Sequence, residues 1–220
     1  MMKIAIISDT HSLLREEVIE TIKDCDVILH EGDIASKETM EAVKALGKAY
    51  FVRGNADKEW AGEIPWELTE EIGGYRFYLT HKKSDIPKDL KGVDFVIYGH
   101  SHKYEVKEEN GITYLNPGSC GPRRFTQPVT MMVMTVDENA HTWKVEKKDF
   151  SPVLKKGDKQ LPKKELDILI KQIIKDMNAN KSVEKIAEKN RVDKEFVEEI
   201  LQIYTTHPGI DIDGILNRMK

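Results

Sequence analysis

Residues 3–11 read Lys3-Ile4-Ala5-Ile6-Ile7-Ser8-Asp9-Thr10-His11, a short apolar run that ends in an acid and a histidine. Four consecutive apolar residues without polar alternation are typical of a strand buried on both faces of its sheet. Apolar residues at helical spacing follow at Leu14, Val18 and Ile22. The stretch therefore predicts a strand that leads into a helix, the repeating unit of an α/β fold.

The same succession continues to about residue 150. Further apolar runs cover residues 27–29, 50–52, 77–79, 95–98 and 113–115. A second helix is predicted from the N-cap Ser36 to Gly47, where glycine suits the left-handed position after a helix. Gly73-Gly74 predicts a hairpin turn, and residues 137–140 predict a turn between two antiparallel strands. Residues 1–150 are thus expected to form one α/β domain.

The composition changes after Phe150. Residues 151–160 contain proline, glycine and several lysines, and they predict a linker. Residues 161–220 predict a small all-α appendage, with one helix presenting Leu166, Ile170 and Ile173 on one face, a second capped by Ser182 and a third beginning at Asp193.

The last two of these helices resemble a helix-turn-helix, which raises the alternative of a DNA-linked regulator. The third helix, however, carries Asp193, Glu195, Glu198 and Glu199, which would repel phosphates from a recognition face. We therefore predict that the tail serves packing or homo-oligomerisation and does not bind nucleic acid.

Overall composition excludes several classes of protein. The chain has 220 residues, a formal net charge of −4 and only two cysteines, Cys25 and Cys120. A negative net charge does not attract the chain to nucleic acid or to an anionic membrane. Two cysteines far apart in the sequence form neither a disulfide framework nor a zinc knuckle. No segment has the length of a membrane span or the core of a signal peptide. A cytoplasmic location is expected.

Metal-binding residue types follow five of the apolar runs at their carboxyl ends. In open α/β sheets ligands bind in the crevice beyond these ends, so separate segments would deliver their side chains to one place. The seven residues are Asp9, His11, Asp33, Asn55, His81, His100 and His102.

Two carboxylates, four imidazoles and one amide exceed what one ion needs and suit a pair of divalent ions that share a carboxylate. Mixed oxygen and nitrogen ligands favour manganese, iron, zinc or nickel over magnesium or calcium. Such a pair activates water and clamps both oxygens of an in-line displacement, so the pattern predicts hydrolysis of a phosphate ester.

The ordered motifs Ser8-Asp9-Thr10-His11, Gly32-Asp33, Gly54-Asn55, His81 and Gly99-His100-Ser101-His102 resemble those of the calcineurin-like metallophosphoesterases. With residues 116–119, their spacing most resembles the small prokaryotic phosphodiesterase branch, over roughly residues 1–150. The resemblance implies a four-layer αββα sandwich and a phosphodiesterase that uses a hydroxide bridging two metal ions.

The resemblance also implies roles for single residues. Asp9, His11 and His102 would bind one ion, Asn55, His81 and His100 the other, and Asp33 would bridge them. Direct catalytic roles would fall to Asp33, Asn55 and His100, and the substrate would be a small phosphodiester. A non-catalytic interaction scaffold of the same fold is the alternative, and it should have lost some of these ligands.

Two positions depart from the family pattern. In many members a histidine follows the asparagine, and this histidine protonates the leaving group or stabilises the transition state. This chain has Ala56 at that position. Small phosphodiesterases commonly lack that histidine as well. Lys82-Lys83 stands where relatives often have glycine, and these lysines either add positive charge near the substrate or are simply solvated.

Other residues are left with two interpretations each. Arg123 and Arg124 either help to bind a phosphate or form a surface pair. Residues 116–119 form either a plain turn or a support for the histidines. Arg53 is either structural or directed into the site. His30 is expected to be a histidine that supports the ligands or is simply packed, rather than an eighth ligand, and Cys120 is expected to be a small packed residue.

Overall fold

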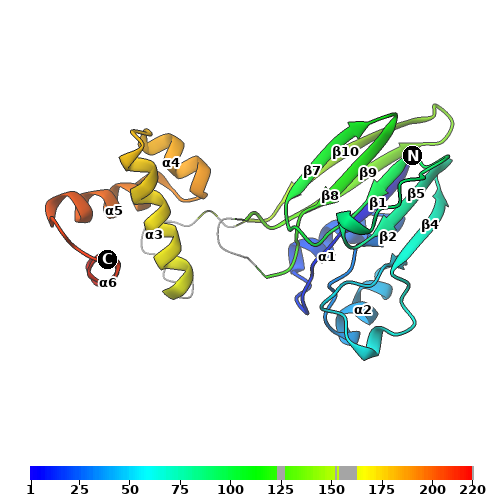
Figure 1. The fold of residues 1–220 in the computed structure, drawn as a ribbon, viewed down its shortest axis with the longest axis horizontal. Coiled ribbons are helices and arrows are strands. Elements are labelled where there is room, and N and C mark those ends of the chain that lie inside the picture. The colour runs from blue at the N-terminus through cyan, green and yellow to red at the C-terminus, as the bar shows by residue number, and fades with distance from the viewer. Residues whose placement is uncertain (123–126, 152, 154–162, 220) are drawn as a thin grey trace. The chain divides into compact units, whose positions relative to one another are not determined.

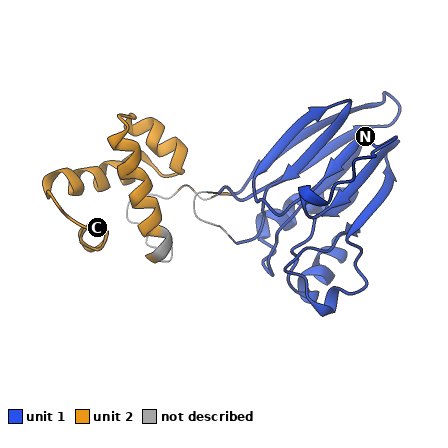
Figure 2. Cartoon of the chain, in the orientation of Figure 1, with its two compact units in different colours: residues 1–123, 127–150 blue, residues 124–126, 151–220 orange. Residues whose placement is uncertain are grey.

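The computed structural model describes residues 1–122, 127–151, 153 and 163–219 (Figure 1). Within this part of the chain two compact units are distinguished (Figure 2). Residues 1–122 and 127–150 lie in the first unit, and the described residues from 151 onward belong to the second. Each unit has a hydrophobic core of its own, so each is described by itself.

The first sheet of unit 1 has the strand order β10-β9-β1-β2-β3. Its strands are β1 (Met2–Ile7), β2 (Val27–His30), β3 (Lys48–Phe51), β9 (Thr130–Asp137) and β10 (Thr142–Asp149). β1, β2 and β3 are parallel, whereas β9 is antiparallel to both β1 and β10. The carboxyl ends of the three parallel strands therefore meet at one edge.

The second sheet has the strand order β4-β5-β6-β8-β7. Its strands are β4 (Glu67–Ile72), β5 (Tyr75–Thr80), β6 (Phe95–Ile97), β7 (Tyr104–Glu109) and β8 (Ile112–Pro117). Gly73 and Gly74 both have positive φ in the predicted hairpin turn between β4 and β5. The edge strands β4 and β7 were not predicted, because most of their residues are exposed and polar.

The two sheets pack face to face around alternate residues of their strands. Ile4 and Ile6 of β1 meet side chains such as Phe77 and Leu79 of β5 in one core cluster. The opposite faces of β1, β2 and β9 pack beneath α1 (Glu16–Lys23) and α2 (Lys37–Lys44). The predicted α/β sandwich is confirmed.

The layer outside the second sheet is built differently from the layer outside the first. Ile86, Leu90 and Val93 cover Tyr78, Val96 and Tyr98, and the segment that carries them has only a short 3-10 turn, η2 (Lys83–Asp85). A second such turn, η1 (Glu59–Ala61), follows β3. Apolar cover thus replaces a full helix on this face.

The boundary of the second predicted helix needs a correction. Ser36 is its N-cap and accepts a hydrogen bond from the Thr39 amide, as expected. The helix ends at Lys44, however, and Gly47 is not among the residues with positive φ. Its last turn is closed by bonds from the Ala45 amide to the Glu41 carbonyl and from the Leu46 amide to the Val43 carbonyl, so the helix ends without a left-handed glycine.

Unit 2 contains four helices in its described part: α3 (Lys163–Asn178), α4 (Val183–Asn190), α5 (Lys194–Thr206) and α6 (Ile212–Arg218). Ser182 and Asp193 cap α4 and α5 as predicted, whereas α6, capped by Asp211, was not predicted. The apolar faces of these helices bury against one another, with Ile170, Phe196 and Ile200 at the centre.

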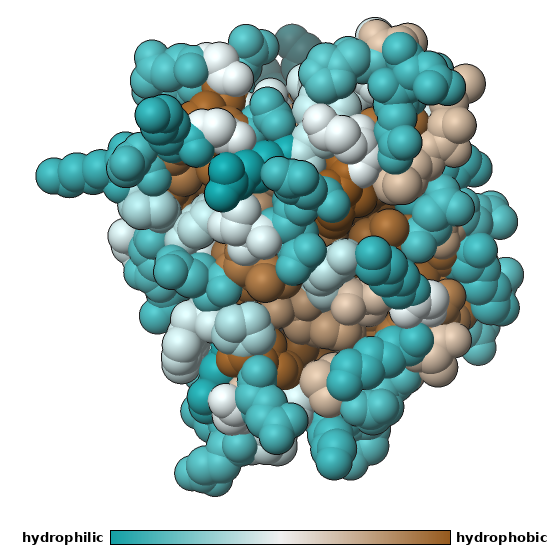
Figure 3. All heavy atoms as spheres, turned by 90° about the vertical axis from the view of Figure 1, so that its right-hand side faces the viewer, coloured by the Kyte–Doolittle hydropathy of each residue, from teal (hydrophilic) through white to brown (hydrophobic). Residues whose placement is uncertain are grey.

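The surface reflects the high content of charged residues, which make up 33% of the chain. On the face drawn in Figure 3, hydrophilic side chains surround smaller apolar areas. None of the helices in the described ranges combines the length and the apolar character that crossing a membrane requires.

Candidate metal centre

The predicted ligands emerge where strands of both sheets end. Asp9 and His11 follow β1, Asp33 follows β2, and the turn with Asn55 follows β3. In the second sheet, His81 follows β5, and His100 and His102 follow β6. The structure brings six of the seven into two groups whose ligand atoms lie within 4.8 Å of one another: Asp9 with His11 and His102, and Asp33 with His81 and His100.

Asp33 lies between the two groups. Its Oδ2 is 3.8 Å from Nε2 of His11 in the first group, and its Oδ1 is 3.4 Å from Nε2 of His81 in the second. The Ala56 amide donates to Oδ1 at 2.6 Å, which fixes the carboxylate in this orientation. Each oxygen of one carboxylate therefore faces a different group, the arrangement that a bridging ligand requires.

Asp9 presents one oxygen to the site and uses the other to hold the loops. Its Oδ2 accepts hydrogen bonds from the Ser8 hydroxyl at 2.6 Å and the His100 amide at 3.1 Å. Its Oδ1 faces Nε2 of His102 at 3.1 Å. The same carboxylate thus ties β1 to the His100 loop and contributes to the first group.

Two ligand-type atoms that face these groups are buried and, within the described residues, make no hydrogen bond: Asp9 Oδ1 and His81 Nε2. A buried polar atom without a partner costs about 1–3 kcal/mol. Oxygen and imidazole nitrogen are also the atom types that divalent transition metals take as ligands. The residues present therefore fit a metal centre.

The backbone at these ligands is strained. Asp9, His11, Asp33, His100 and His102 all have positive φ, between 44° and 64°. Residues other than glycine rarely adopt this region, and such outliers gather at functional sites, where the surrounding structure maintains them. The observed strain sets these turns apart from ordinary strand ends.

Two glycines allow the strand ends to approach so closely. A Cβ at Gly54 would lie 2.3 Å from Asp33 Oδ1, and a Cβ at Gly99 would lie 2.0 Å from the Ser8 hydroxyl oxygen. Both glycines have ordinary φ. Glycine is therefore required at both positions for steric reasons, because a side chain would separate a ligand loop from the neighbouring strand end.

A family model described as the calcineurin-like phosphoesterase superfamily domain matches residues 2–139, more than half of the chain. The chain belongs to this superfamily. The family resemblance read from the motifs is confirmed.

Archaeal relatives support the same assignment. A probable metallophosphoesterase of Methanothermobacter thermautotrophicus is 32% identical over 150 residues, which is 62% of this chain and 87% of that protein. A phosphodiesterase of Methanocaldococcus jannaschii is 32% identical over 140 residues, which is 54% of this chain and 84% of that protein.

Solved structures agree on the fold. The structure of an archaeal phosphodiesterase matches with a TM-score of 0.56 and 26% identity, covering 67% of this chain and all of that one. Vps29 of Chaetomium thermophilum matches with a TM-score of 0.55 and 18% identity over 69% of this chain and 99% of its own. The phosphoesterase sandwich predicted for the first domain is confirmed.

Around the candidate ligands lies a layer of supporting polar side chains. Asn116 donates to the Gly99 carbonyl at 2.8 Å and to the Ser101 hydroxyl at 3.1 Å, and the Ser119 hydroxyl donates to the Asp9 carbonyl at 2.9 Å. Of the two interpretations of residues 116–119, the structure therefore favours support of the site.

Asp57 is a supporting residue that the sequence did not reveal. It is buried, and its two oxygens accept hydrogen bonds from the amides of Ala35 at 2.7 Å and Gly54 at 2.8 Å. It thereby joins the loops after β2 and β3. In the sequence it follows Ala56 as one acid among many, and only its burial distinguishes it.

Charge in the second group is arranged for an ionised Asp33. Burial favours the neutral acid, but His81 and the Ala56 amide outweigh it and lower the pKa of Asp33 to about 2. Burial likewise opposes a charge on His81, yet the facing Asp33 carboxylate raises the pKa of that imidazole. Asp33 is therefore an anion in the folded protein, as a metal ligand must be.

Of the remaining predicted residues, Asn55 is exposed on the turn between Gly54 and Asp57. Arg123 and Arg124, the predicted substrate-binding pair, lie outside the described residues. His30 is fully buried, with its Nε2 3.0 Å from the Thr10 hydroxyl, and Cys120 is a buried free thiol. Both are packed residues, as expected.

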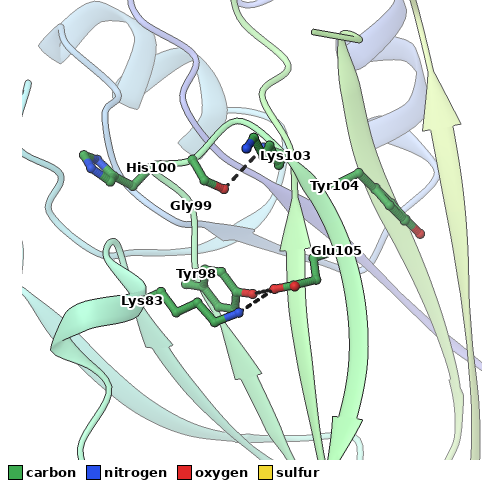
Figure 4. Close-up of a pocket in the computed structure, with 8 residues that line it drawn as sticks. Lys83, Tyr98, Gly99, His100, Lys103, Tyr104 and Glu105 are labelled. Carbon is green, nitrogen blue, oxygen red and sulfur yellow. Dashed lines mark hydrogen bonds and ion pairs between the residues drawn. The ribbon is translucent and has the colours of Figure 1, made fainter. Parts of the chain in front are cut away.

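A pocket of about 360 Å³ lies beside His100 (Figure 4). Lys83 lines it, and its ammonium is 2.8 Å from an oxygen of Glu105, which also accepts from the Tyr98 hydroxyl. In Figure 4 the His100 ring points away from these three side chains. Lys83 is therefore neither simply solvated nor directed at the ligands, and its charge is balanced by Glu105.

Proposed function

We propose that this protein is a phosphodiesterase that works with two divalent metal ions and acts on small phosphodiesters. The observation that carries the proposal is the position of Asp33, whose two oxygens face the two groups of ligands separately. The family of the chain and the phosphodiesterase among its relatives support it. A scaffold that had lost its ligands is not favoured, because all six carboxylate and imidazole ligands converge.

In this proposal Asp9, His11 and His102 hold one ion, His81, His100 and Asn55 hold the other, and Asp33 contacts both. When bound, two such ions lower the pKa of water towards neutrality and neutralise the charge on the attacking and leaving oxygens. Manganese, iron, zinc and nickel all suit the ligand types, and availability decides among them.

The protein's own residues orient and charge the site. The Ala56 amide and the buried Asp57 hold the loop after β3 against Asp33, and Ser8 holds Asp9. Ala56 itself has no side chain that could donate a proton to the leaving oxygen. We therefore propose that the reaction depends on leaving groups that carry negative charge well.

The tail is proposed to provide stability or association and no catalytic group. Its buried apolar side chains form a core separate from those of unit 1. Cys25 and Cys120 are free thiols, which fits the reducing cytoplasm as the place of action.

The test begins with elemental analysis of the purified protein, followed by assay of bis(p-nitrophenyl) phosphate and p-nitrophenyl phosphate with each metal added back. Asp33→Asn should remove activity while the protein stays folded, because an amide offers one oxygen and no charge to two groups of ligands. Asp137→Asn is the matched control. One side-chain oxygen of Asp137 accepts hydrogen bonds from the Asn139 and Ala140 amides, and the amide oxygen of asparagine can accept the same two bonds. A folded Asp33→Asn protein with near wild-type turnover would refute the two-metal proposal.

A further inference from the structure

Trp66 is an unusually exposed indole. Its exposed fraction is 58%, and among the large apolar side chains in the described ranges only Met1 is more exposed. An exposed aromatic ring forgoes the stabilisation that burial would give. A single exposed apolar residue is ordinary on a protein surface, so the case for a binding site rests on where this ring lies and how it is held.

The strand register places Trp66 at the rim of the metal centre. β4 and β5 are antiparallel, and Glu67 is paired with Thr80. Trp66 directly precedes β4 and His81 directly follows β5, so one further step of the same register sets Trp66 opposite His81. The sheet thus presents Trp66 at the same edge as the ligands.

Arg53 places the same indole beside the other ligand loop. Its amide donates to the Pro65 carbonyl at 2.7 Å, and its guanidinium carbon lies 4.8 Å from the centre of the Trp66 ring. Arg53 directly precedes Gly54-Asn55. A Cβ at Gly32 would lie 2.7 Å from the Gly54 nitrogen and 2.9 Å from Nδ1 of His81, so the loops on either side of Trp66 meet at the centre.

The guanidinium is itself fixed. Its Nε and Nη2 donate to the Asp57 carbonyl at 3.2 and 3.1 Å, and Nη2 donates to the Lys58 carbonyl at 2.9 Å. A cation over one part of an indole orients the ring through its quadrupole. The structure therefore favours a structural role for Arg53. Through its contact with the ring, this residue also orients Trp66.

We propose that Trp66 is the stacking surface for a nucleobase, and that the substrates of this site are nucleoside phosphodiesters. A base joined to the phosphate through one sugar would extend from the metal centre to its rim. A flat, pre-oriented indole stacks on any base, because every base has a π-face. The inference rests on the proposed function only in assuming that the phosphate is bound at the metal centre.

The surroundings favour a base over an acyl chain. Arg53, whose guanidinium carbon lies 4.8 Å from the centre of the ring, is a cation, and a charged group there does not suit a hydrocarbon tail. A single exposed ring offers a flat area rather than the long apolar groove that a lipid chain would need. Lipid-derived diesters are therefore the disfavoured class.

The test compares two phosphates that differ only by the base, adenosine 5′-monophosphate and ribose 5-phosphate. Each is titrated calorimetrically into the full-length, metal-loaded protein. Stacking is expected to make the nucleotide bind about tenfold or more tightly than the sugar phosphate. Trp66→Leu should remove most of this preference, whereas Trp66→Phe should keep part of it. Binding of the sugar phosphate should be the same in all proteins.

Trp143→Leu is the matched control. Trp143 is also exposed, at 38%, but it pairs with Val136, which pairs with Met2 at the opposite end of β1 from Asp9. An unchanged preference in folded Trp66→Leu, or equal binding of the two phosphates by the wild type, would overturn the inference. Because the readout is binding, base-dependent binding without any diesterase activity would instead refute the proposed function and leave the stacking site standing.

Discussion

Gly54→Ala should disrupt metal binding at the candidate centre, although it adds only one methyl group. The new Cβ would lie 2.1 Å from the Asp33 nitrogen, 2.3 Å from its Oδ1 and 2.8 Å from its Cα. Carbon contacts are comfortable at about 3.5–4.0 Å, so the two loops must separate by about 1 Å or more. Most of the clashing atoms belong to the backbone, which cannot move aside by a change of rotamer.

The expected magnitudes follow from that displacement. Overpacking of this kind costs about 1–3 kcal/mol, and each kcal/mol lowers the Tm of a protein of this size by about 2–4 °C. Metal ligands tolerate only about 0.2 Å of displacement. A shift of the Asp33 carboxylate by about 1 Å should therefore cost far more metal affinity than stability.

The assay is metal content after dialysis, together with diesterase activity and thermal unfolding. Gly47→Ala is the control, because Gly47 has ordinary φ and nothing lies within 4 Å of its added Cβ. It should leave metal content, activity and Tm close to the wild type. A Gly54→Ala protein that keeps both ions and full activity would show that Asp33 is not held as described.

Three further predictions concern other parts of the molecule. Cutting the chain between residues 151 and 160 should leave metal-dependent activity in unit 1, whose core is separate from that of the tail; a truncated protein that folds and binds metal but is inactive would contradict this. Burial lowers the pKa of His30 to about 3, below its usual 6.5, so the stability that neutral His30 provides is full above pH 6.5 and is lost as pH falls towards 3. Between pH 7.5 and 5 the Tm of the wild type should therefore fall more than that of His30→Gln, and parallel curves would argue against a neutral buried His30. Because Ala56 has no side chain that could protonate the leaving group, kcat/KM should rise steeply as the leaving-group pKa falls, and Ala56→His should help poor leaving groups most; a flat dependence in the wild type would mean that another group supplies the proton.

Much of the fold could be predicted because its elements are locally encoded. Runs such as Ile4 to Ile7 are apolar on both faces, and the caps Ser36, Ser182 and Asp193 bind amides only three residues away. The edge strands β4 and β7 escaped prediction because exposed strands carry polar residues and lack such a pattern. The true end of α2 is likewise set by local backbone bonds that composition does not reveal. Helix α6 begins at a cap of the same kind, from Asp211 to the Gly214 amide, but its seven residues are too few to show a clear helical pattern.

By itself the sequence determined which residue types stand at strand ends, and hence that Asp9, Asp33, His81 and His100 could meet at one edge. Only the tertiary structure decided how they meet. The direction of the Asp33 oxygens, the clamp formed by Asp57 and the position of Trp66 over Arg53 depend on contacts between loops from different strands. Spacing along one chain carries no information about such contacts, because they form only when strands far apart in the sequence, of one sheet or of both, bring their carboxyl ends together.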